Sequence, residues 1–317
     1  MKKIGILTRD CAGINACIRA IVRTAAHYDI ETIGFIRGYD GIMDGELVPL
    51  NRRSVSGIIN LGGTILKTAR ATRFLTKEGQ KKAVETLTKN HVSGLIVVGG
   101  NGSLKGAHTL AKRYSVPVIG IPATIDNDIS KVNQAIGADT AVNVAMDALD
   151  KIRDTATSLE RIFVVEVMGR DSGYIAFQVA LAGGCEEVLA PEQDFNYETI
   201  CDEIRKGNAK GKKSWIIIVA EGKAKATNVA NVITSLTGLE TRVAILGHIQ
   251  RGGRPTATDR ILAAQLGSYA VELLKDGHSD ECVRLHEGVL DSIPLSKAIK
   301  PGKMEFKNYY KLIKILT

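Results

Sequence analysis

Short aliphatic runs alternate with amphipathic segments along the chain, and this alternation constrains the fold more than any other feature of the sequence. Runs of four to six residues rich in isoleucine and valine occur at 4–7, 95–98, 116–121, 162–167, 216–219 and 243–246. Such runs are typical of strands buried on both faces of a parallel sheet. Between them, residues 15–28 and 140–153 repeat apolar side chains with the period of a helix. We therefore predict an α/β fold.

The length of 317 residues favours two lobes over one. We expect two lobes, each a mostly parallel sheet flanked by helices, with ligands bound at the carboxyl ends of the strands. No apolar run approaches the ~18 residues of a membrane span. The run 4–7 is also too short for the core of a signal peptide, and it is better explained as a buried first strand.

The net charge and the cysteine content limit the classes of ligand and the cellular compartment that we expect. The net charge of +8 would suit a nucleic acid, but aromatic residues make up only 5% of the chain and its basic residues are dispersed among glycine-rich loops. A pocket for small phosphorylated ligands explains the charge as well. No C-x-x-C pair occurs, so we expect a cytoplasmic protein with free thiols at Cys11, Cys17, Cys185, Cys201 and Cys282.

A glycine-rich loop, Gly-Gly-Asn-Gly-Ser at 99–103, directly follows the run 95–98. Its backbone N–H groups could approach phosphate oxygens at the start of a helix. A tight strand-to-helix turn is the simpler alternative. The loop is not a Walker motif, because no Gly-Lys-Ser/Thr sequence closes it.

Two carboxylates, Asp126 and Asp128, flank Asn127 on the loop after the run 116–121. In an extended segment, side chains two residues apart share a face, so both carboxylates would point into one cleft. One could accept a proton while the other holds a metal or orients a partner. An Asx-turn or a helix cap is the alternative for this peptide.

Basic residues fall into two sets. Arginine binds a phosphate dianion well, because its guanidinium donates two parallel hydrogen bonds. The first set lies near strand ends and consists of Arg161, Arg170, Arg242 and Arg251. His248 lies on the same loop as Arg251. In the second set, Arg19 and Arg23 share a helical face. The remaining members, which only the tertiary structure could bring close to these two, are Arg52, Arg153, Lys210 and Lys212. By itself this second set is equally consistent with an ordinary solvated surface.

Three motifs together resemble the signatures of the phosphofructokinase family. They are Pro-Ala-Thr-Ile-Asp-Asn-Asp at 122–128, Val-Met-Gly-Arg at 167–170 and Gly-His-Ile-Gln-Arg-Gly-Gly at 247–253, in the family's order and spacing. The similarity runs from Met1 past residue 300 and is closest to bacterial enzymes of about this length. It implies Mg²⁺-dependent phosphoryl transfer from ATP to the 1-hydroxyl of fructose 6-phosphate. It also implies two similar lobes, a donor lobe of 1–137 and 250–301 and a sugar-phosphate lobe of 138–249 and 302–317.

The resemblance implies roles for individual residues. Asp126 would be the base for the sugar hydroxyl, and Arg70 would bridge the transferring phosphoryl group; Thr124, Asp128 and Arg170 would complete the catalytic set. The sugar phosphate would be bound by Thr124, Asp126, Asp128, Arg161, Met168, Gly169, Arg170, Glu221, Arg242, His248 and Arg251. Arg161 and Arg242 would reach in from a neighbouring subunit, which implies a homo-oligomer, typically a tetramer in the family. The nucleotide site would comprise Tyr39, Arg70, Gly100, Asn101, Gly102, Ser103 and Gly106, with Asn101 or Asp128 as metal ligands.

The second basic set resembles the family's effector pocket for ADP or phosphoenolpyruvate. The matching residues are Arg19, Arg23, Arg52, Arg153, Gly184, Glu186, Lys210 and Lys212. Gly57 stands where relatives often carry an acid, and Ser214 replaces a common histidine. We expect phosphate binding here and leave the identity of the effector open.

The donor half departs further from the family pattern. Relatives usually begin Thr-Ser-Gly-Gly-Asp-x-x-Gly-x-Asn, whereas residues 8–15 are Thr-Arg-Asp-Cys-Ala-Gly-Ile-Asn, so Arg9 stands where backbone would approach phosphate. Asn101 replaces an acid that helps to hold magnesium. Gly102 and Ala123 are small, as in ATP users. Two alternatives stay open: a regulatory paralogue that binds sugar phosphate without a working donor site, and a kinase that uses pyrophosphate.

Overall fold

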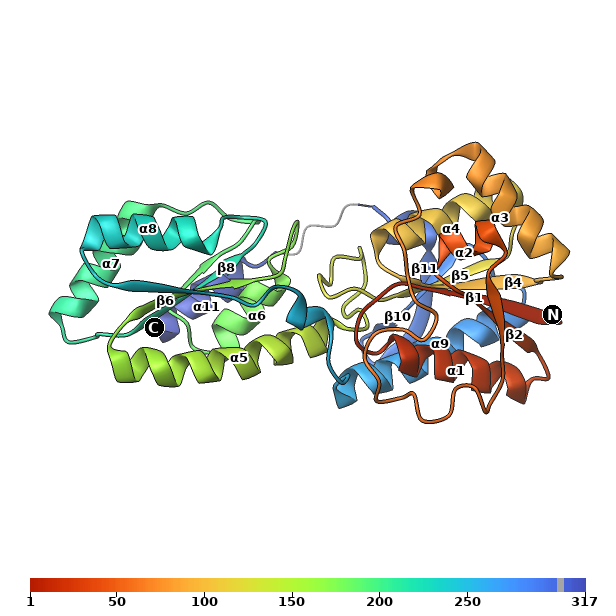
Figure 1. The fold of residues 1–317 in the computed structure, drawn as a ribbon, viewed down its shortest axis with the longest axis horizontal. Coiled ribbons are helices and arrows are strands. Elements are labelled where there is room, and N and C mark those ends of the chain that lie inside the picture. Colours follow the sequence, from red (N-terminus) through yellow and green to blue (C-terminus); the bar gives the residue numbers. More distant parts are fainter. Residues whose placement is uncertain (301–304) are drawn as a thin grey trace. The chain divides into compact units, whose positions relative to one another are not determined.

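The computed structural model describes residues 1–300 and 305–317, which form two α/β units (Figure 1). Unit 1 comprises Met1–Thr140 and resumes at Arg251, and unit 2 comprises Ala141–Gln250 and the C-terminal segment. The predicted α/β fold with two mostly parallel sheets is confirmed. The predicted second crossing between lobes, at 301–302, lies outside the described residues. The functions predicted for the two lobes stay predictions.

Unit 1 is built on a sheet whose described strands follow the order β11-β10-β5-β4-β1-β2-β3. The inner strands run parallel, and β3 and β11 pair antiparallel at the two edges. The strands are β1 (Lys3–Thr8), β2 (Glu31–Phe35), β3 (Leu47–Leu50), β4 (Gly94–Gly99), β5 (Val118–Pro122), β10 (Glu281–His286) and β11 (Val289–Pro294). In β4 every residue is buried, as a strand covered on both faces requires.

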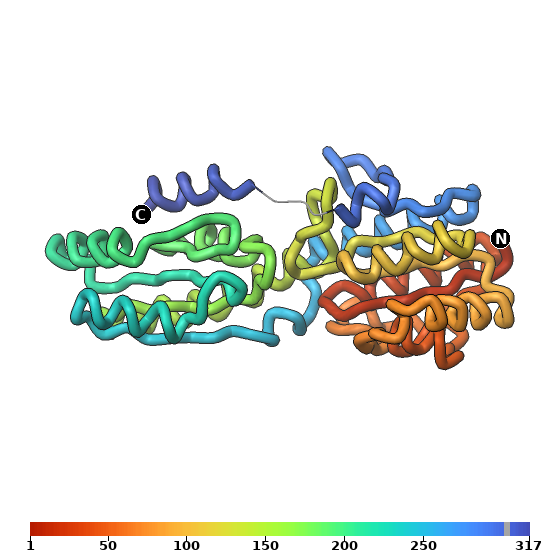
Figure 2. The backbone as a smooth tube through the Cα atoms, turned by 90° about the horizontal axis from the view of Figure 1, so that it is seen from above, coloured from red at the N-terminus to blue at the C-terminus, as the bar shows by residue number. Residues whose placement is uncertain are grey.

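Helices cover both faces of this sheet (Figures 1 and 2). On one face, α1 (Ile14–His27) packs along α9 (Ala257–Lys275). The other face carries α2 (Tyr39–Asp44), η1 (Thr72–Leu75), α3 (Lys77–Lys89), α4 (Asn101–Tyr114) and α10 (Leu295–Ala298). Leu7, Leu95 and Leu104 belong to the apolar core beneath this second set of helices.

Unit 2 is built on a parallel sheet whose described strands follow the order β7-β8-β6-β9. The strands are β6 (Ile162–Val167), β7 (Glu187–Leu189), β8 (Trp215–Ala220) and β9 (Thr241–Ile245). One face is covered by α7 (Tyr197–Ala209) and α8 (Ala226–Thr237). The opposite face carries α5 (Ala138–Leu159), α6 (Tyr174–Ala182) and α11 (Lys307–Leu316), and η2 (Gly247–Arg251) follows β9 (Figure 1).

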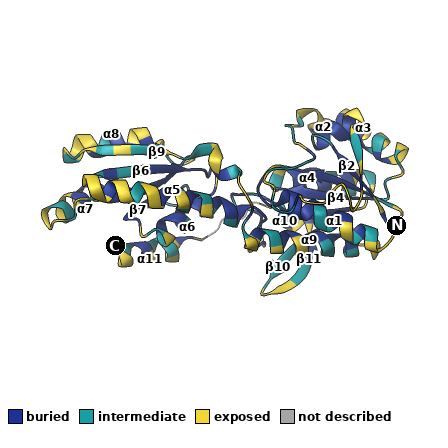
Figure 3. Ribbon diagram, turned by 60° about the horizontal axis from the view of Figure 1, so that its bottom comes forward, coloured by how far each residue is buried: buried dark blue, intermediate teal, exposed yellow. Residues whose placement is uncertain are grey.

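All six aliphatic runs overlap strands, but one of them differs from the prediction in its burial. The run 243–246 was expected to be buried on both faces, whereas β9 forms an edge of its sheet and Ile245 is 58% exposed. Figure 3 shows the contrast between the buried central strands and the exposed outer surfaces of the helices. All five cysteines are buried free thiols, as predicted. None of the helices in the described part of the chain could cross a membrane.

Candidate active site

The carboxyl ends of β4 and β5 bring the two predicted loops of unit 1 together. These strands are parallel neighbours, with Gly99 opposite Pro122, so the loops that follow them emerge side by side. The Ala123 amide donates to the Gly99 carbonyl at 3.1 Å. A Cβ built on Gly100 would lie 3.4 Å from the Thr124 Cβ. The glycine-rich loop therefore contacts the loop that carries Asp126 and Asp128.

The backbone at 126–128 is not extended, so the predicted reason for the two carboxylates to share a face is wrong. Asn127 adopts a left-handed conformation with φ 47°. Asparagine tolerates this region because its short side chain can bond locally. Here the Asn127 side chain is buried, and it donates to the Asn133 carbonyl at 3.0 Å and accepts from the Ala135 amide at 2.7 Å. A local polar anchor, rather than a strand, fixes this turn.

Asn101 opens α4 and lies against Asp128. Its Nδ2 donates to the Asp128 carboxylate at 2.8 Å and to the Asp128 carbonyl at 3.3 Å. Two predicted metal ligands from different loops thus meet. Within residues 1–300 and 305–317, no group of three or more histidine, cysteine or acidic side chains could hold a metal by itself.

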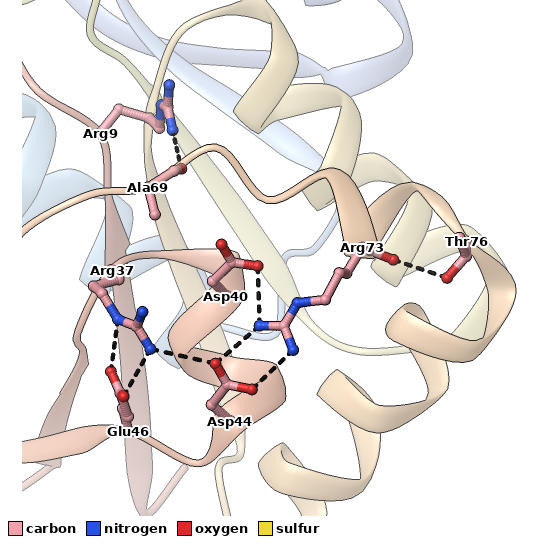
Figure 4. A network of polar contacts seen from close by, with 8 residues as sticks. All are labelled: Arg9, Arg37, Asp40, Asp44, Glu46, Ala69, Arg73 and Thr76. Carbon is pink, nitrogen blue, oxygen red and sulfur yellow. Dashed lines mark hydrogen bonds and ion pairs between the residues drawn. The ribbon is translucent and has the colours of Figure 1, made fainter.

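Arg9 follows β1 directly and is held between the ends of β1 and β4. Its backbone amide donates to the Val98 carbonyl at 3.0 Å, and its Nη1 donates to the Ala69 carbonyl at 2.5 Å (Figure 4). Burial lowers the pKa of Arg9, and the cations Arg251 and Arg70 lower it further, against Asp10. This corner of unit 1 therefore concentrates positive charge.

Tyr39 connects the predicted nucleotide residues. Its hydroxyl donates to the Ser103 carbonyl at 2.8 Å, and a Cβ built on Gly106 would lie 2.7 Å from its ring. The Tyr39 ring stacks on Phe74 with centroids 4.0 Å apart. These contacts place α2 and η1 against the first turns of α4.

A network of ion pairs connects Arg37 and Arg73 with carboxylates on and just after α2 (Figure 4). Arg73 forms a two-point contact with Asp44, at 3.0 and 2.8 Å, and a further one with Asp40 at 3.3 Å. Arg37 forms a second two-point contact with Glu46, at 2.9 and 2.7 Å, and also reaches Asp44 at 3.3 Å. The pKa of the Asp44 carboxyl is lowered, chiefly by its hydrogen bond from Arg73. Sequence inspection missed this network, because its members are ordinary surface residue types.

In unit 2, the ends of β6 and β8 bring Gly169, Arg170 and Glu221 together. The Glu221 amide donates to the Val167 carbonyl at 2.9 Å, and the Gly222 amide donates to the Gly169 carbonyl at 3.0 Å. A Cβ on Gly169, whose φ is 142°, would lie 2.4 Å from the Ser172 carbonyl oxygen. Only glycine fits that position.

The other residues predicted for the sugar site lie in both units. Met168 is buried and its amide donates to Gln250 Oε1 at 3.4 Å, whereas His248 is exposed on η2. Arg251 belongs to unit 1, as Asp126 does.

Arg161 and Arg242 lie at the amino ends of β6 and β9, away from Arg170 at the carboxyl end of β6. Strand β6 has six residues and spans roughly 20 Å. Both arginines pair with Glu240, Arg161 at 2.8 Å through its Nε. Within one chain, the structure therefore does not bring them to the other residues of unit 2 that are predicted for the sugar site.

The predicted effector residues form one group in each unit. In unit 2, Arg153 Nη2 donates to the Gly184 carbonyl at 3.2 Å, and Lys212 pairs with Glu186 at 2.9 Å. Lys210 caps the C-terminus of α7. In unit 1, Arg52 donates to the Ala26 carbonyl at 3.4 Å, on the helix that carries Arg19 and Arg23.

Comparison with known proteins gives a consistent result. The family model described as Phosphofructokinase matches residues 3–274. The ATP-dependent 6-phosphofructokinases of Thermotoga petrophila and Bacillus subtilis are each 46% identical to the chain over 319 residues, with 100% of both chains covered.

Solved structures agree with the sequence matches. Phosphofructokinase from Saccharomyces cerevisiae has a TM-score of 0.87 at 32% identity and matches 94% of this chain, which spans 45% of the yeast chain. A pyrophosphate-dependent phosphofructokinase from Marinobacter aquaeolei shares the fold, with a TM-score of 0.87 at 22% identity over 100% of this chain and 91% of that one.

Proposed function

The chain belongs to the phosphofructokinase family, and we propose that it transfers a phosphoryl group from ATP to the 1-hydroxyl of fructose 6-phosphate, giving fructose 1,6-bisphosphate. The observation that carries this conclusion is the 46% identity to ATP-dependent 6-phosphofructokinases over the full length of both chains. This reaction is a step of glycolysis. The contact between the glycine-rich loop and the Asp126 loop supports the proposal.

Asp126 is proposed to take the proton of the sugar hydroxyl. Phosphoryl transfer depends mostly on positioning and charge stabilisation, so the base must be held in place before the substrate arrives. The Asp126 amide donates to the Thr124 hydroxyl at 3.2 Å, and the buried Asn127 anchors the turn on its other side. These contacts supply the rigidity that the role demands.

ATP is the donor that the small residues at 102 and 123 favour. A Cβ built on Gly102 would meet no atom within 4 Å, so internal packing does not require glycine at this position. The open space is available to the donor. Arg9, Arg70 and Arg251 would together neutralise the negative charge of the donor's phosphates, since arginine is well suited to phosphate binding.

Magnesium fits the residues present. Mg²⁺ is commonly bound by one or two carboxylates together with substrate phosphates rather than by an all-protein cage. Asp128 would supply the carboxylate and Asn101 an amide oxygen, and bound Mg²⁺ would neutralise charge on the donor's phosphates. Because Asn101 carries no charge, Asn101→Asp should lower the magnesium concentration that gives half the maximal rate. An unchanged magnesium requirement would remove residue 101 from this role.

An effector site is proposed for the second basic set. The Arg153 and Lys212 contacts gather its unit 2 members, and Arg52 lies against the helix of Arg19 and Arg23. An effector coupled by about 1–3 kcal/mol must shift sugar affinity about 5- to 150-fold. Calorimetry with ADP and phosphoenolpyruvate should detect binding, and Arg19→Ala should weaken it. An equal affinity in the wild-type protein and the Arg19→Ala variant would refute the assignment.

A coupled assay tests the proposed reaction directly. We expect turnover with ATP, fructose 6-phosphate and saturating magnesium, and little with pyrophosphate. Turnover with pyrophosphate alone would reassign the donor. No turnover with either donor, while calorimetry still detects tight fructose 6-phosphate binding, would favour a regulatory paralogue whose altered first loop has lost the donor.

A further inference from the structure

The segment 68–76 carries Arg70, the residue proposed to bridge the transferring phosphoryl group. It links the buried Leu66 to the start of α3, and only η1, at Thr72–Leu75, is regular. Arg70 is exposed, and so is Arg73 three residues later. An irregular exposed segment loses conformational entropy when it is ordered, so something must hold it if Arg70 is to be placed before the donor binds.

The segment is held immediately before Arg70. The Ala69 carbonyl accepts a hydrogen bond from the Arg9 guanidinium at 2.5 Å, and the Arg9 backbone amide in turn donates to the Val98 carbonyl at 3.0 Å. The side chain of Arg9 passes over Gly99, where a Cβ would come within 2.8 Å of the Arg9 Cγ. Ala69 is therefore tied to the ends of β1 and β4.

The segment is held again just after Arg70. Arg73 forms its two-point contact with Asp44 on α2 and reaches Asp40, one turn earlier on the same helix. Its carbonyl accepts the Thr76 hydroxyl at 2.8 Å, and its neighbour Phe74 stacks on Tyr39. The Asp44 carboxylate is in turn shared with Arg37 (Figure 4).

From these two attachments we infer that Arg73 is a positioning residue for Arg70, acting through its contact with Asp44. Only three residues, 70–72, lie between the attached positions, so their backbone has little freedom. The Arg73 contact also fixes the distance between Arg70 and Tyr39, because Asp44 and Tyr39 are on one short helix. The inference rests on the proposed function, since it concerns the rate of the proposed transfer.

An exposed two-point ion pair contributes little to global stability, whereas displacement of a reacting group by about 1 Å can cost about 10²-fold in rate. Arg73→Gln should therefore lower kcat roughly 10- to 100-fold, leave the KM for fructose 6-phosphate within about 2-fold, and leave the thermal midpoint nearly unchanged. Asp44→Asn weakens the same contact from the other side, together with the 3.3 Å contact from Arg37, and should lower kcat at least as much.

The decisive measurement is a double-mutant cycle with Arg70→Met. If Arg73 acts through Arg70, Arg73→Gln should lower kcat by less than about 2-fold in the Arg70→Met background. Arg205→Gln is the control, because the Arg205 side chain is about as exposed as that of Arg73 and pairs with Asp202 on α7, in unit 2. It should leave kcat unchanged.

Each remaining outcome is decisive. Equal losses from Arg73→Gln in both backgrounds, or no loss in the wild-type background, would overturn the positioning role while leaving the proposed function intact. A wild-type protein without turnover would overturn the proposed function and this role with it.

Discussion

At the scale of single residues, the turn at 124–128 is the part of the molecule whose chemistry is easiest to test. Asp126→Asn keeps the shape of the side chain but cannot accept the sugar proton, so kcat should fall by roughly 10² to 10⁴. Fructose 6-phosphate should still bind, because the positive residues of the proposed sugar site are untouched. Steady-state kinetics and calorimetry on one preparation measure both quantities.

Asp128→Asn is the comparison for this experiment. If Asp128 serves the metal rather than the proton, its replacement should raise the magnesium requirement more than it lowers the rate at saturating magnesium. A normal kcat for Asp126→Asn would remove Asp126 from the role of base.

The residue types of this turn were predictable, but their geometry was not. Asp126 and Asp128 stand out because two carboxylates follow a buried strand, yet the extended backbone that we expected is replaced by a left-handed Asn127. The side chain of Asn127 makes its hydrogen bonds to Asn133 and Ala135, and the sequence around Asn127 does not predict those partners. The contact of Arg9 with Ala69 spans 60 positions and is likewise beyond local reasoning.

At the scale of elements, strands were predictable where burial dominates their composition. Strands β1, β4, β5, β6 and β8 are rich in aliphatic residues, although Glu166 interrupts β6, and the sequence pattern finds each of them. Strand β2 escaped because its sequence, Glu-Thr-Ile-Gly-Phe, mixes polar and apolar residues, and the β10–β11 hairpin escaped because its strands are only partly buried. A search for uninterrupted aliphatic runs therefore misses strands in which polar residues or glycine break the run, whether they lie inside the sheet or at its edge.

The starts of α5 and α9 are locked together by Asp259, which is fully buried. Its carboxylate accepts from the amides of Gly137 and Thr140, at 2.9 and 2.8 Å, and from the Thr140 hydroxyl at 2.5 Å. Thr256 caps α9 by accepting from the Asp259 amide at 3.3 Å. The Thr-x-x-Asp spacing at 256–259 is the sequence signal that could have revealed this start.

Removing this carboxylate should destabilise the fold. Asp259→Ala leaves three donors without their acceptor and removes the cap of α5, which together cost roughly 2–4 kcal/mol. The midpoint of urea unfolding, followed by circular dichroism, should fall accordingly. Asp276→Ala, at the exposed end of the same helix, is the control and should shift stability by no more than about 0.5 kcal/mol. Equal midpoints for the two variants would contradict the role given to Asp259.

At the scale of the whole molecule, the positions of Arg161 and Arg242 raise the question of whether one chain can complete the proposed sugar site. Arg161 and Arg242 are at the amino ends of their strands, and each is paired with Glu240 in the same chain. Arg170 and Glu221 lie at the carboxyl ends of neighbouring strands. We propose that the two arginines serve the sugar phosphate of an adjacent subunit in a homo-oligomer, as a tetramer of the family type would allow.

Complementation between two variants tests this arrangement, with the assay run at a fructose 6-phosphate concentration well below the KM of Arg242→Ala, where each variant alone is nearly inactive. Arg242→Ala should raise the KM for fructose 6-phosphate, and Asp126→Asn should abolish most turnover. In a hybrid formed by co-expression of the two variants, a site that takes Asp126 from one chain and Arg242 from the other is intact. Random pairing makes such sites about one quarter of the total, so the mixture should regain about one quarter of the wild-type rate.

The matched control is Asp126→Asn with Arg170→Ala, because both of those residues are assigned to the same chain's site, and that mixture should stay inactive. Full activity of a monomer, established by light scattering at the assay concentration, would contradict a shared site.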